Sequence, residues 1–373
     1  MDNSITIRTV KSKKDLNDFI DFPYELYKND PLWVPRVKVD ILHTFADDNP
    51  FWSHSEKILL LAEKNGKIAG RITGTIDRNY IEFQGASVGF FGFFECIEDF
   101  EIAKKLLDSV KNWLKEKKIK VMSGPFSPST NDELSFLLEG YDSSPYVMMP
   151  YNPAYYHGFM EKFGLRKSKD LLAMIVDLKN IPEERYSRLE NKIIARTPGV
   201  TIRPIDFKDF EGEAKRVEYV YNNAWEKNWG FVPWTHEEFF YICKSLKPLF
   251  IRDLTLIASV GDKPVGVSIV IPNYNIVFKK INGKLNVPGL IKFLYYKKKI
   301  KELRMMVFGV IKEYRNKGIE GLMYLRSLRS AIKMGYERAE GSWVLEDNKN
   351  IIQSGERLGA KVYKKYRVYE MEI

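Results

Sequence analysis

The stretch 307–321 combines residue types that could bind a phosphate group. It runs from an apolar, strand-like segment into a short turn with Arg315, Lys317 and Gly318, and then into an amphipathic helical pattern. Such a turn presents free N–H groups and the positive end of a helix dipole to one point. Glycine serves where the backbone must approach an anion closely. The stretch predicts a pyrophosphate site, although a solvated basic helix start fits the same spacing.

Other kinds of chemistry find little support in the sequence. Four scattered histidines and two cysteines, Cys96 and Cys243, show no metal-ligand spacing and cannot form a disulfide framework. The composition, with 45% hydrophobic and 29% charged residues, is typical of a globular chain. The first residues lack a signal-peptide core, and no apolar run reaches membrane-spanning length. We therefore expect a cytoplasmic protein without a metal.

The net charge of +10 is unevenly distributed along the chain. Residues 1–180 hold 24 basic and 26 acidic side chains, whereas residues 181–373 hold 35 and 23. Nine basic residues fall within 279–304, against the single acid Glu302. The positive charge therefore belongs mainly to one segment, and it does not predict nucleic acid as a partner of the whole chain.

The chain repeats one pattern at an offset of about 195 residues. Two stretches read as β-hairpins, 63–80 with Asn65-Gly66 at the turn and 259–275 with Gly261-Asp262 at the turn. Further landmarks recur in the same order, and they include Asn152 with Asn348 and Gly164 with Gly359. We infer a tandem duplication, with units 1–180 and 181–373 and a basic insertion at 279–304 in the second. The predicted linker, 179–200, has a short charged helix bracketed by Pro182, Pro198 and Gly199.

Each unit is predicted to contain two helices, a β-hairpin, a central strand, a long helix, a strand, a helix and a closing strand. The central strands are 87–94 and 305–311, and the long helices are 100–117 and 317–334. This pattern predicts an α/β (α+β) fold in which helices cover a mixed sheet. The second long helix should bury one apolar face, formed by Ile319, Leu322, Met323, Leu325, Leu328, Ile332 and Met334.

The stretch 315–321, Arg-Asn-Lys-Gly-Ile-Glu-Gly, resembles the cofactor motif Arg/Gln-x-x-Gly-x-Gly/Ala of the GCN5-related N-acetyltransferases (GNAT). The chain is similar to long bacterial members with two such units. The resemblance implies that each unit is a mixed, mostly antiparallel β-sheet flanked by helices. It also implies that acetyl-CoA or another acyl-CoA donates an acyl group to an amine of a small molecule or peptide. Glu320 departs from the motif, because Gly or Ala is usual there.

The resemblance also implies which residues would hold coenzyme A. Backbone groups of Phe308 and Val310 would bind the pantetheine arm, and the amides from Asn316 to Gly321 would bind the pyrophosphate. Asn348 stands eleven residues before Gly359, as in the family. The cofactor candidates are Phe308, Val310, Arg315, Asn316, Lys317, Gly318, Ile319, Glu320, Gly321 and Asn348. The first unit has Glu98, Asp99 and Glu101 where the anion would lie, and we expect no coenzyme A there.

Five residues are candidates for proton transfer, and Glu340, Tyr363 and Glu346 lead them. The tyrosine that often serves the family as general acid is Gly355 here, so Tyr363 becomes a candidate, with Tyr324 or water as alternatives. Glu340 is the first candidate for general base, because its predicted strand adjoins the expected thioester position. Glu346 and Glu95 are alternatives, and each of these carboxylates could instead be an ordinary surface group.

Two segments could bind the acceptor. The first is the aromatic cluster at 221–234, with the candidates Trp225, Asn228 and Trp229, whose rings could equally be packing. The second is the polar loop 124–142, with the candidates Ser129, Asn131 and Glu133. The polar residues before Glu133 also fit a helix N-cap, which is the simpler interpretation.

The basic insertion 279–304 mixes lysines with aliphatic and aromatic residues. It fits a solvated lid, a contact with a membrane surface or lipid-like substrate, or a contact with RNA. For the whole chain, the leading hypothesis is acyl transfer from acyl-CoA to an amine. Aminoacyl transfer from charged tRNA by a Fem-like enzyme and a catalytically degenerate ligand-binding protein are the alternatives.

Overall fold

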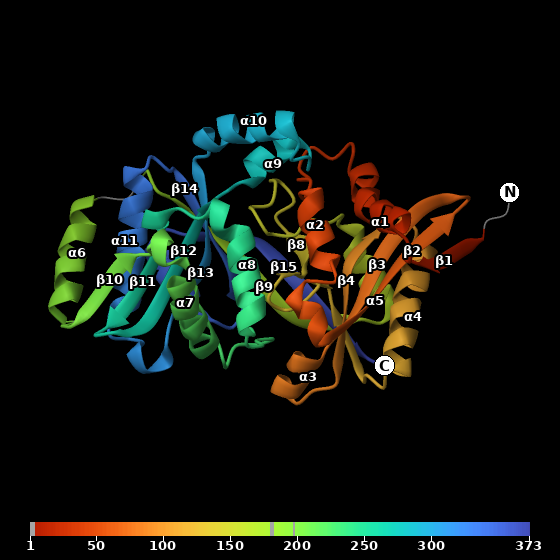
Figure 1. Ribbon diagram of the computed structural model, residues 1–373, viewed down its shortest axis with the longest axis horizontal. Helices are drawn as coiled ribbons and strands as arrows, with labels where there is room; N and C mark the ends of the chain where they lie inside the picture. Colours follow the sequence, from red (N-terminus) through yellow and green to blue (C-terminus); the bar gives the residue numbers. More distant parts are fainter. Residues whose placement is uncertain (1–3, 180–182, 197) are drawn as a thin grey trace.

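The computed structural model describes residues 4–179, 183–196 and 198–373 (Figure 1). Within these residues, one 13-stranded sheet runs through the molecule in the order β1-β2-β3-β4-β5-β15-β9-β14-β13-β12-β11-β10, with β8 beside β15. Neighbouring strands are antiparallel except for the pairs β4–β5 and β13–β14. The mixed, mostly antiparallel sheet flanked by helices is confirmed.

The first half of the chain supplies one end of the sheet. Its strands are β1 (Ile5–Thr9), β2 (Ser55–Lys64), β3 (Lys67–Asp77), β4 (Val88–Cys96), β5 (Val121–Gly124), β6 (Phe126–Ser127), β7 (Glu133–Leu134), β8 (Phe136–Glu139) and β9 (Arg166–Asp177). Its helices are α1 (Lys13–Leu26), α2 (Lys38–Phe45), α3 (Arg78–Gln84), α4 (Phe100–Glu116) and α5 (Tyr155–Phe163).

The second half supplies the other end. Its strands are β10 (Val200–Pro204), β11 (Thr255–Val260), β12 (Lys263–Pro272), β13 (Glu302–Val310), β14 (Arg338–Leu345) and β15 (Lys361–Glu372). Its helices are α6 (Glu183–Arg196), α7 (Phe210–Ala224), α8 (His236–Leu246), α9 (Asn275–Ile281), α10 (Val287–Tyr296), α11 (Ile319–Lys333) and α12 (Lys349–Arg357). Short 3-10 turns lie at Pro50–Ser53, Phe207–Asp209, Lys247–Leu249, Arg252–Leu254, Lys297–Lys299 and Lys312–Tyr314.

Helices cover both faces of the sheet. In β2, Leu59 and Leu61 pack against α1 and α2, whereas Leu60 and Ala62 face α4. The side chains of β11 and β12 point alternately to the two faces of the sheet in the same way. Ile257 faces α7, whereas the residues before and after it face α11. This two-sided burial follows from the period of two along a strand, and it explains why the hairpin strands are apolar throughout.

Most of the predicted elements are confirmed. Both hairpins form with the expected two-residue turns, and α4 and α11 lie within two residues of the predicted long helices. Gly164 and Gly359 follow α5 and α12 with positive φ angles of 99° and 86°, as a glycine at a helix C-terminus should. Two details of the apolar face were wrong, because Ile332 and Met334 at the end of α11 are exposed.

Other parts of the fold differ from the expectations. Strands β1 and β10 were not predicted, and each extends a hairpin edge. The N-cap interpretation of the polar loop was wrong, because no helix follows Glu133, and the chain instead forms the short strands β6, β7 and β8. The predicted insertion, 279–304, overlaps the end of α9 and contains α10, and its last three residues, 302–304, belong to β13.

The two halves share the centre of the sheet. Strand β15, the last of the chain, lies between β5 and β9 of the first half, and β9 in turn pairs with β14 of the second half. Figure 1 shows β15 reaching across the molecule from the second half. The predicted linker helix is α6, while the boundary at residue 180 and Pro182 lie outside the described residues. Each half therefore completes the sheet of the other.

Candidate active site

Strands β13 and β14 separate in the middle of the sheet. They pair in parallel only from Glu302 to Met305 on β13 and from Arg338 to Gly341 on β14. Beyond these positions, residues 307–310 of β13 pair with β12 alone, and the register shifts at Met306. Residues 305–309 stay partly exposed although their strand is central. A gap between two parallel strands thus opens beside Phe308 and Val310.

The loop that follows β13 is held by Arg315. Its Nε donates to the carbonyl of Val310 at 2.8 Å, and a second guanidinium nitrogen donates to the carbonyl of Ala224 at the end of α7. The loop then turns through Asn316 and Gly318, whose φ angles are +60° and +91°. Glycine suits such a conformation because it has no Cβ. The Arg315 side chain thus shapes the loop from behind.

The amides at the start of α11 are available to an anion. Among the described residues, the backbone N–H groups from Lys317 to Gly321 donate to no protein acceptor. The amide of Asn316 donates to the Glu320 carboxylate at 3.3 Å. The loop therefore has the donors that a pyrophosphate needs, and its Glu320 carboxylate stands where it competes for one of them.

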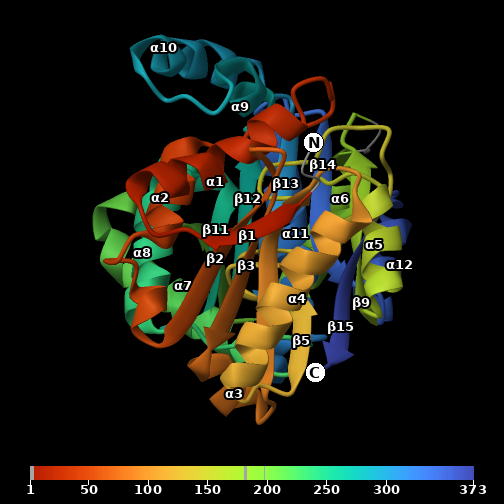
Figure 2. The same ribbon diagram turned by 90° about the vertical axis from the view of Figure 1, so that its right-hand side faces the viewer.

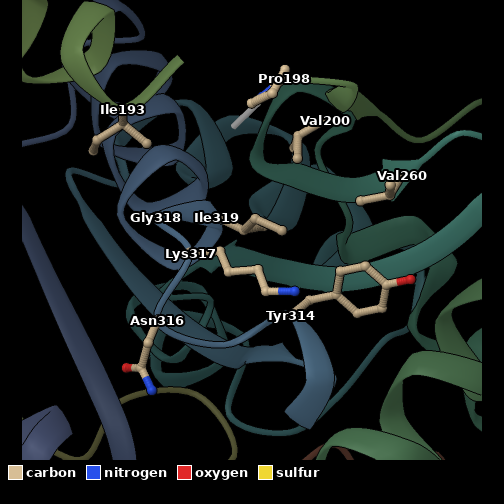
Figure 3. Close-up of a pocket in the computed structure, with 9 residues that line it drawn as sticks. All are labelled: Ile193, Pro198, Val200, Val260, Tyr314, Asn316, Lys317, Gly318 and Ile319. Atoms are coloured by element: carbon tan, nitrogen blue, oxygen red, sulfur yellow. The ribbon is translucent and has the colours of Figure 1, made fainter. Parts of the chain in front are cut away.

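A pocket of about 580 Å³ lies beside this loop (Figure 3). It is lined by Ile193 of α6, Pro198, Val200, Val260, Tyr314, Asn316, Lys317, Gly318 and Ile319. In Figure 3, the Lys317 ammonium points toward the Tyr314 ring, 5.2 Å from its centroid, and the Asn316 amide points away from the pocket. The pocket borders β10 and β11, so it flanks the loop on the side opposite to β14.

A buried carboxylate lies at the point where β13 and β14 part. Glu340 of β14 is fully buried, and it pairs in register with Arg304 of β13. The Glu340 Oε1 accepts a hydrogen bond from Ser342 Oγ at 2.6 Å, and its Oε2 accepts one from the Tyr363 hydroxyl. Arg304 Nε lies 4.0 Å from Oε1 and donates to Ser342 Oγ at 2.9 Å. The four side chains form one network.

Burial sets the protonation of this network. Desolvation raises the pKa of Glu340, and Arg304, Ser342 and Tyr363 only partly oppose it. Desolvation and the nearby Glu340 charge raise the pKa of Tyr363 far above its usual range. Tyr363 therefore keeps its proton and donates it toward Glu340. A carboxylate with a raised pKa is suited to accept a proton near neutral pH.

A loop from the first half covers this network. Lys364 of β15 is buried, and its Nζ donates to the carbonyls of Gly140 and Ser143, in the latter case at 2.9 Å. Arg304 donates to the carbonyl of Val147 at 2.8 Å. Within the described residues, the buried hydroxyl of Tyr366 has no hydrogen-bond partner. Both halves of the chain therefore build the surroundings of Glu340.

The other predicted polar residues have structural partners. Glu346 accepts from Lys167 at 2.7 Å and from the Asp170 amide at 3.0 Å, which ties β14 to β9. Asn348 caps α12 by accepting from the Ile351 amide. Glu95 lies in the first half, where the hydroxyls of Tyr27 and Tyr156 donate to it at 2.6 and 2.9 Å. Burial raises the pKa of Glu95 to about 7.

The two predicted acceptor segments contact each other. Asn131 donates to the carbonyl of Val232 at 3.2 Å and accepts from the Tyr221 hydroxyl at 3.1 Å. The Trp229 ring lies 6.4 Å from that of Phe126. Loop 124–142 of the first half thus docks on the aromatic segment of the second.

The individual acceptor candidates take different places in this contact. The Trp225 ring covers Gly309 of β13, since a Cβ there would lie 2.5 Å from it. The backbone N–H of Asn228 donates to the carbonyl of Trp225 at 2.7 Å, and this hydrogen bond closes the turn after α7. Ser129 is buried and bonds Asp132, whereas Glu133 is partly exposed and lies 3.6 Å from Arg36. Trp225 is therefore the candidate nearest to the open strand β13.

The equivalent gap in the first half is filled by the chain itself. Strands β4 and β5 pair only from Val88 to Phe90, and beyond this β6 lies against β4. The Phe93 amide donates to Ser127 Oγ at 3.0 Å, and a Cβ at Gly92 would lie 1.7 Å from the carbonyl oxygen of Phe126. Asp99 caps α4 by accepting from the Glu101 amide. Both the gap and the helix N-terminus are thus occupied by protein groups.

Arg304 and Ser342 were missed as candidate site residues. Arg304 had been grouped with the exposed lysines of the insertion, but it lies buried in β13 beside Glu340. The sequence signal for a buried Arg304 was its position at the junction of a basic segment and an apolar strand. Nothing in the local sequence distinguishes Ser342. Among the described residues, no three His, Cys, Asp or Glu side chains form a group that could hold a metal ion.

Comparisons with known proteins agree with this architecture. No protein-family model matches the chain. Protein YghO of Escherichia coli (strain K12) is 33% identical over 98% of this chain and 95% of its own. The bacterial ceramide synthase of Caulobacter vibrioides is 32% identical over 99% and 98%. A solved tandem GNAT protein from the clavulanic acid biosynthesis pathway superposes with a TM-score of 0.60, at 12% identity, over 99% of this chain and 98% of its own.

The shared sheet and the parted parallel strands give the chain the fold of the solved tandem GNAT protein. The chain belongs to the family that includes protein YghO and the bacterial ceramide synthase, and it has a tandem GNAT fold. The tandem GNAT fold that the motif at 315–321 implied is thereby confirmed.

Proposed function

We propose that this protein transfers an acyl group from acyl-CoA to the amine of a lipid-like acceptor. The observation that carries the proposal is the buried carboxylate of Glu340 at the point where β13 and β14 part. The GNAT fold and the relatives support acyl transfer as the class of reaction. Acetyl transfer is the smallest case, and one relative points to a larger product, because a ceramide is an amide between a fatty acid and a long-chain amino alcohol.

The chain offers two places for the acyl donor. The free amides from Lys317 to Gly321 would bind the pyrophosphate, helped by the dipole of α11. The open edge of β13 at Phe308 and Val310 would bind the pantetheine arm by backbone hydrogen bonds. The thioester carbonyl would then lie in the gap near Glu340 and Trp225.

Tyr363 and Glu340 form the proton relay. Glu340 is sealed from solvent, whereas Tyr363 is only half-buried, so the acceptor amine meets the Tyr363 hydroxyl. As the amine nitrogen bonds to the thioester carbon, Tyr363 takes the amine proton and passes its own to Glu340. The C–S bond breaks, and the same proton returns through Tyr363 to the thiolate sulfur. Arg304 and Ser342 hold Glu340 in place throughout.

A thiol-release assay tests this function. Purified protein is mixed with acetyl-CoA or palmitoyl-CoA, with and without a long-chain amino alcohol, and free coenzyme A is followed with a thiol reagent. We expect amine-dependent release, faster with the long-chain donor. Tight coenzyme A binding without release with any amine would instead favour a degenerate binding protein. Transfer that requires charged tRNA would favour the Fem-like alternative.

A further inference from the structure

We propose that the outer face of α10 docks on the surface of an anionic lipid bilayer. The helix is an addition to the second half, since the matching place in the first half has only the seven-residue α3. Figure 2 shows α10 standing away from the body of the molecule, with α9 beneath it. Its outer face therefore has room for a partner of large extent.

One side of α10 attaches it to the protein. The Phe293 ring stacks on Tyr274 with centroids 5.7 Å apart and planes within 6°. The same ring lies 6.5 Å from Phe278 of α9, and Gly289 on this side is buried. These contacts fix the orientation of α10, so its opposite side is directed outward by packing.

The outward side carries an exposed apolar stripe. Val287, Leu290, Ile291 and Leu294 follow the i, i+3, i+4, i+7 spacing of one helix face, and they are 75%, 51%, 64% and 47% exposed. Such a stripe normally packs on a core, and here it faces solvent. An unpartnered aliphatic face of this kind marks a contact surface.

The surrounding charge identifies the chemistry of the partner. Exposed lysines flank the stripe at Lys284, Lys292 and 297–299, and no Asp or Glu occurs between 263 and 301. A second copy of this surface would be repelled by its own lysines, and a nucleic acid would leave the aliphatic stripe unburied. An anionic bilayer offers both an apolar layer and negative head groups.

The base of the insertion connects this surface to the candidate active site. Asn275 at the start of α9 donates to the carbonyl of Pro145 at 2.8 Å, and Asn273 accepts from the Val147 amide at 3.0 Å. Val147 in turn accepts from Arg304 beside Glu340. A bilayer bound at α10 would therefore lie next to the loop that covers the site, where a lipid amine could enter.

Flotation of the full-length protein with vesicles tests the proposal without any substrate. The vesicles are phosphatidylcholine alone or phosphatidylcholine with phosphatidylglycerol at three to one. We expect binding to the anionic vesicles, weakened by high salt, and at least tenfold weaker binding to the neutral ones. Ile291→Ser with Leu294→Ser should reduce anionic binding at least tenfold, and Lys297→Glu with Lys298→Glu should act similarly.

Controls separate docking from folding. Ile332→Ser with Ile351→Ser removes two exposed apolar side chains elsewhere and should leave vesicle binding and the melting temperature unchanged. Leu290→Trp should show a blue-shifted emission only with anionic vesicles. Equal flotation of the wild type and the Ile291/Leu294 variant would overturn the proposal. Dimerisation that depends on Ile291 and Leu294, or retention on RNA that blocks the vesicles, would overturn it as well.

Discussion

Glu340 combines complete burial with a network of hydrogen-bond donors. Burial raises the pKa of Glu340, and the positive charge of Arg304, 4.0 Å away, opposes this by favouring the ionised carboxylate. The hydrogen bonds from Ser342 and Tyr363 orient both carboxylate oxygens. Such an arrangement is typical of functional carboxylates, because a structural group would be less costly if it were apolar.

Glu340→Gln should reduce kcat about 10²–10³-fold with little change in KM, because the amide cannot accept the proton. In the wild type, the rate should rise with pH as Glu340 ionises, through an apparent pKa above the ordinary value of about 4.3. The variant should lose this rise. Steady-state rates from pH 5 to 9 provide the check.

Glu346→Gln is the matched control for this change. Its carboxylate bonds Lys167 and the Asp170 amide, away from the network of Glu340. We expect its pH profile to match the wild type. A profile that changes in this variant but persists in Glu340→Gln would transfer the role of base to Glu346.

Tyr363→Phe separates the relay from simple positioning. The ring and its packing remain, but the hydroxyl that donates to Glu340 is lost. We expect a fall in kcat of about 10–100-fold and an unchanged affinity for coenzyme A. Stopped-flow rates and isothermal titration measure the two quantities. A loss of coenzyme A affinity with full kcat would contradict the relay.

At the scale of elements, the sequence predicted what local chemistry determines. The turns at Asn65-Gly66 and Gly261-Asp262 and the glycines after α5 and α12 depend on backbone conformations that only certain residues adopt. The loop at 124–142 was misread because an N-cap pattern depends on the same polar residues as a tight loop. Arg304 was misplaced because burial depends on contacts with Val147 and Ser342, which are distant along the chain.

The loop before α11 allows a test of the departure at Glu320. The Glu320 carboxylate accepts a hydrogen bond from the Asn316 amide and places a negative charge beside the expected pyrophosphate. Glu320→Gly removes both the hydrogen bond and the charge. We expect coenzyme A to bind about three- to tenfold more tightly, with the largest gain at low salt. Isothermal titration gives the affinity.

Glu313→Gln is the control for that experiment, because its exposed side chain precedes the loop. It should change the affinity less than about twofold. Weaker coenzyme A binding in Glu320→Gly would show that the carboxylate supports the loop more than it repels the ligand. Gly318→Asp should abolish binding, since φ at +91° strains the residue and the new charge repels the anion.

At the scale of the whole molecule, the two halves depend on each other in ways that no local pattern encodes. Strand β15 completes the first half and β9 completes the second, and such pairing between distant segments is set by tertiary packing. The duplication was visible because paired landmarks recur in order. The exchange of closing strands between the halves was not visible in the sequence. A closing strand shows the same alternation of residues whether it pairs with its own half or with the other.

An ion-pair triad also joins the halves. His54 of the first half contacts Asp77 at 3.2 Å and Glu238 of α8 at 3.0 Å. Burial lowers the pKa of His54, but hydrogen bonds to the two carboxylates outweigh this and raise it to about 9. The triad therefore stabilises the folded state only while His54 is charged.

The stability of the protein should depend on pH through this histidine. Because its folded-state pKa lies above the unfolded value of about 6.5, the contribution is complete below pH 6.5 and is lost as the pH rises through 9. We expect a loss of about 1–3 kcal/mol in the free energy of unfolding between pH 6 and 9.5, measured by urea denaturation. His54→Gln should reduce this difference, whereas His43→Gln, at an exposed position, should retain it. Equal pH dependence in the wild type and His54→Gln would contradict the prediction.

The acyl-transfer function itself is tested most directly by following a labelled acyl group into product. The full-length protein is incubated with carbon-13-labelled acyl-CoA and a long-chain amino alcohol, and the lipids are analysed by mass spectrometry. The labelled amide should form with the wild type and with Glu346→Gln, and at least a hundredfold more slowly with Glu340→Gln. Equal amide formation by the wild type and Glu340→Gln, or no amide from any acyl-CoA, would contradict it.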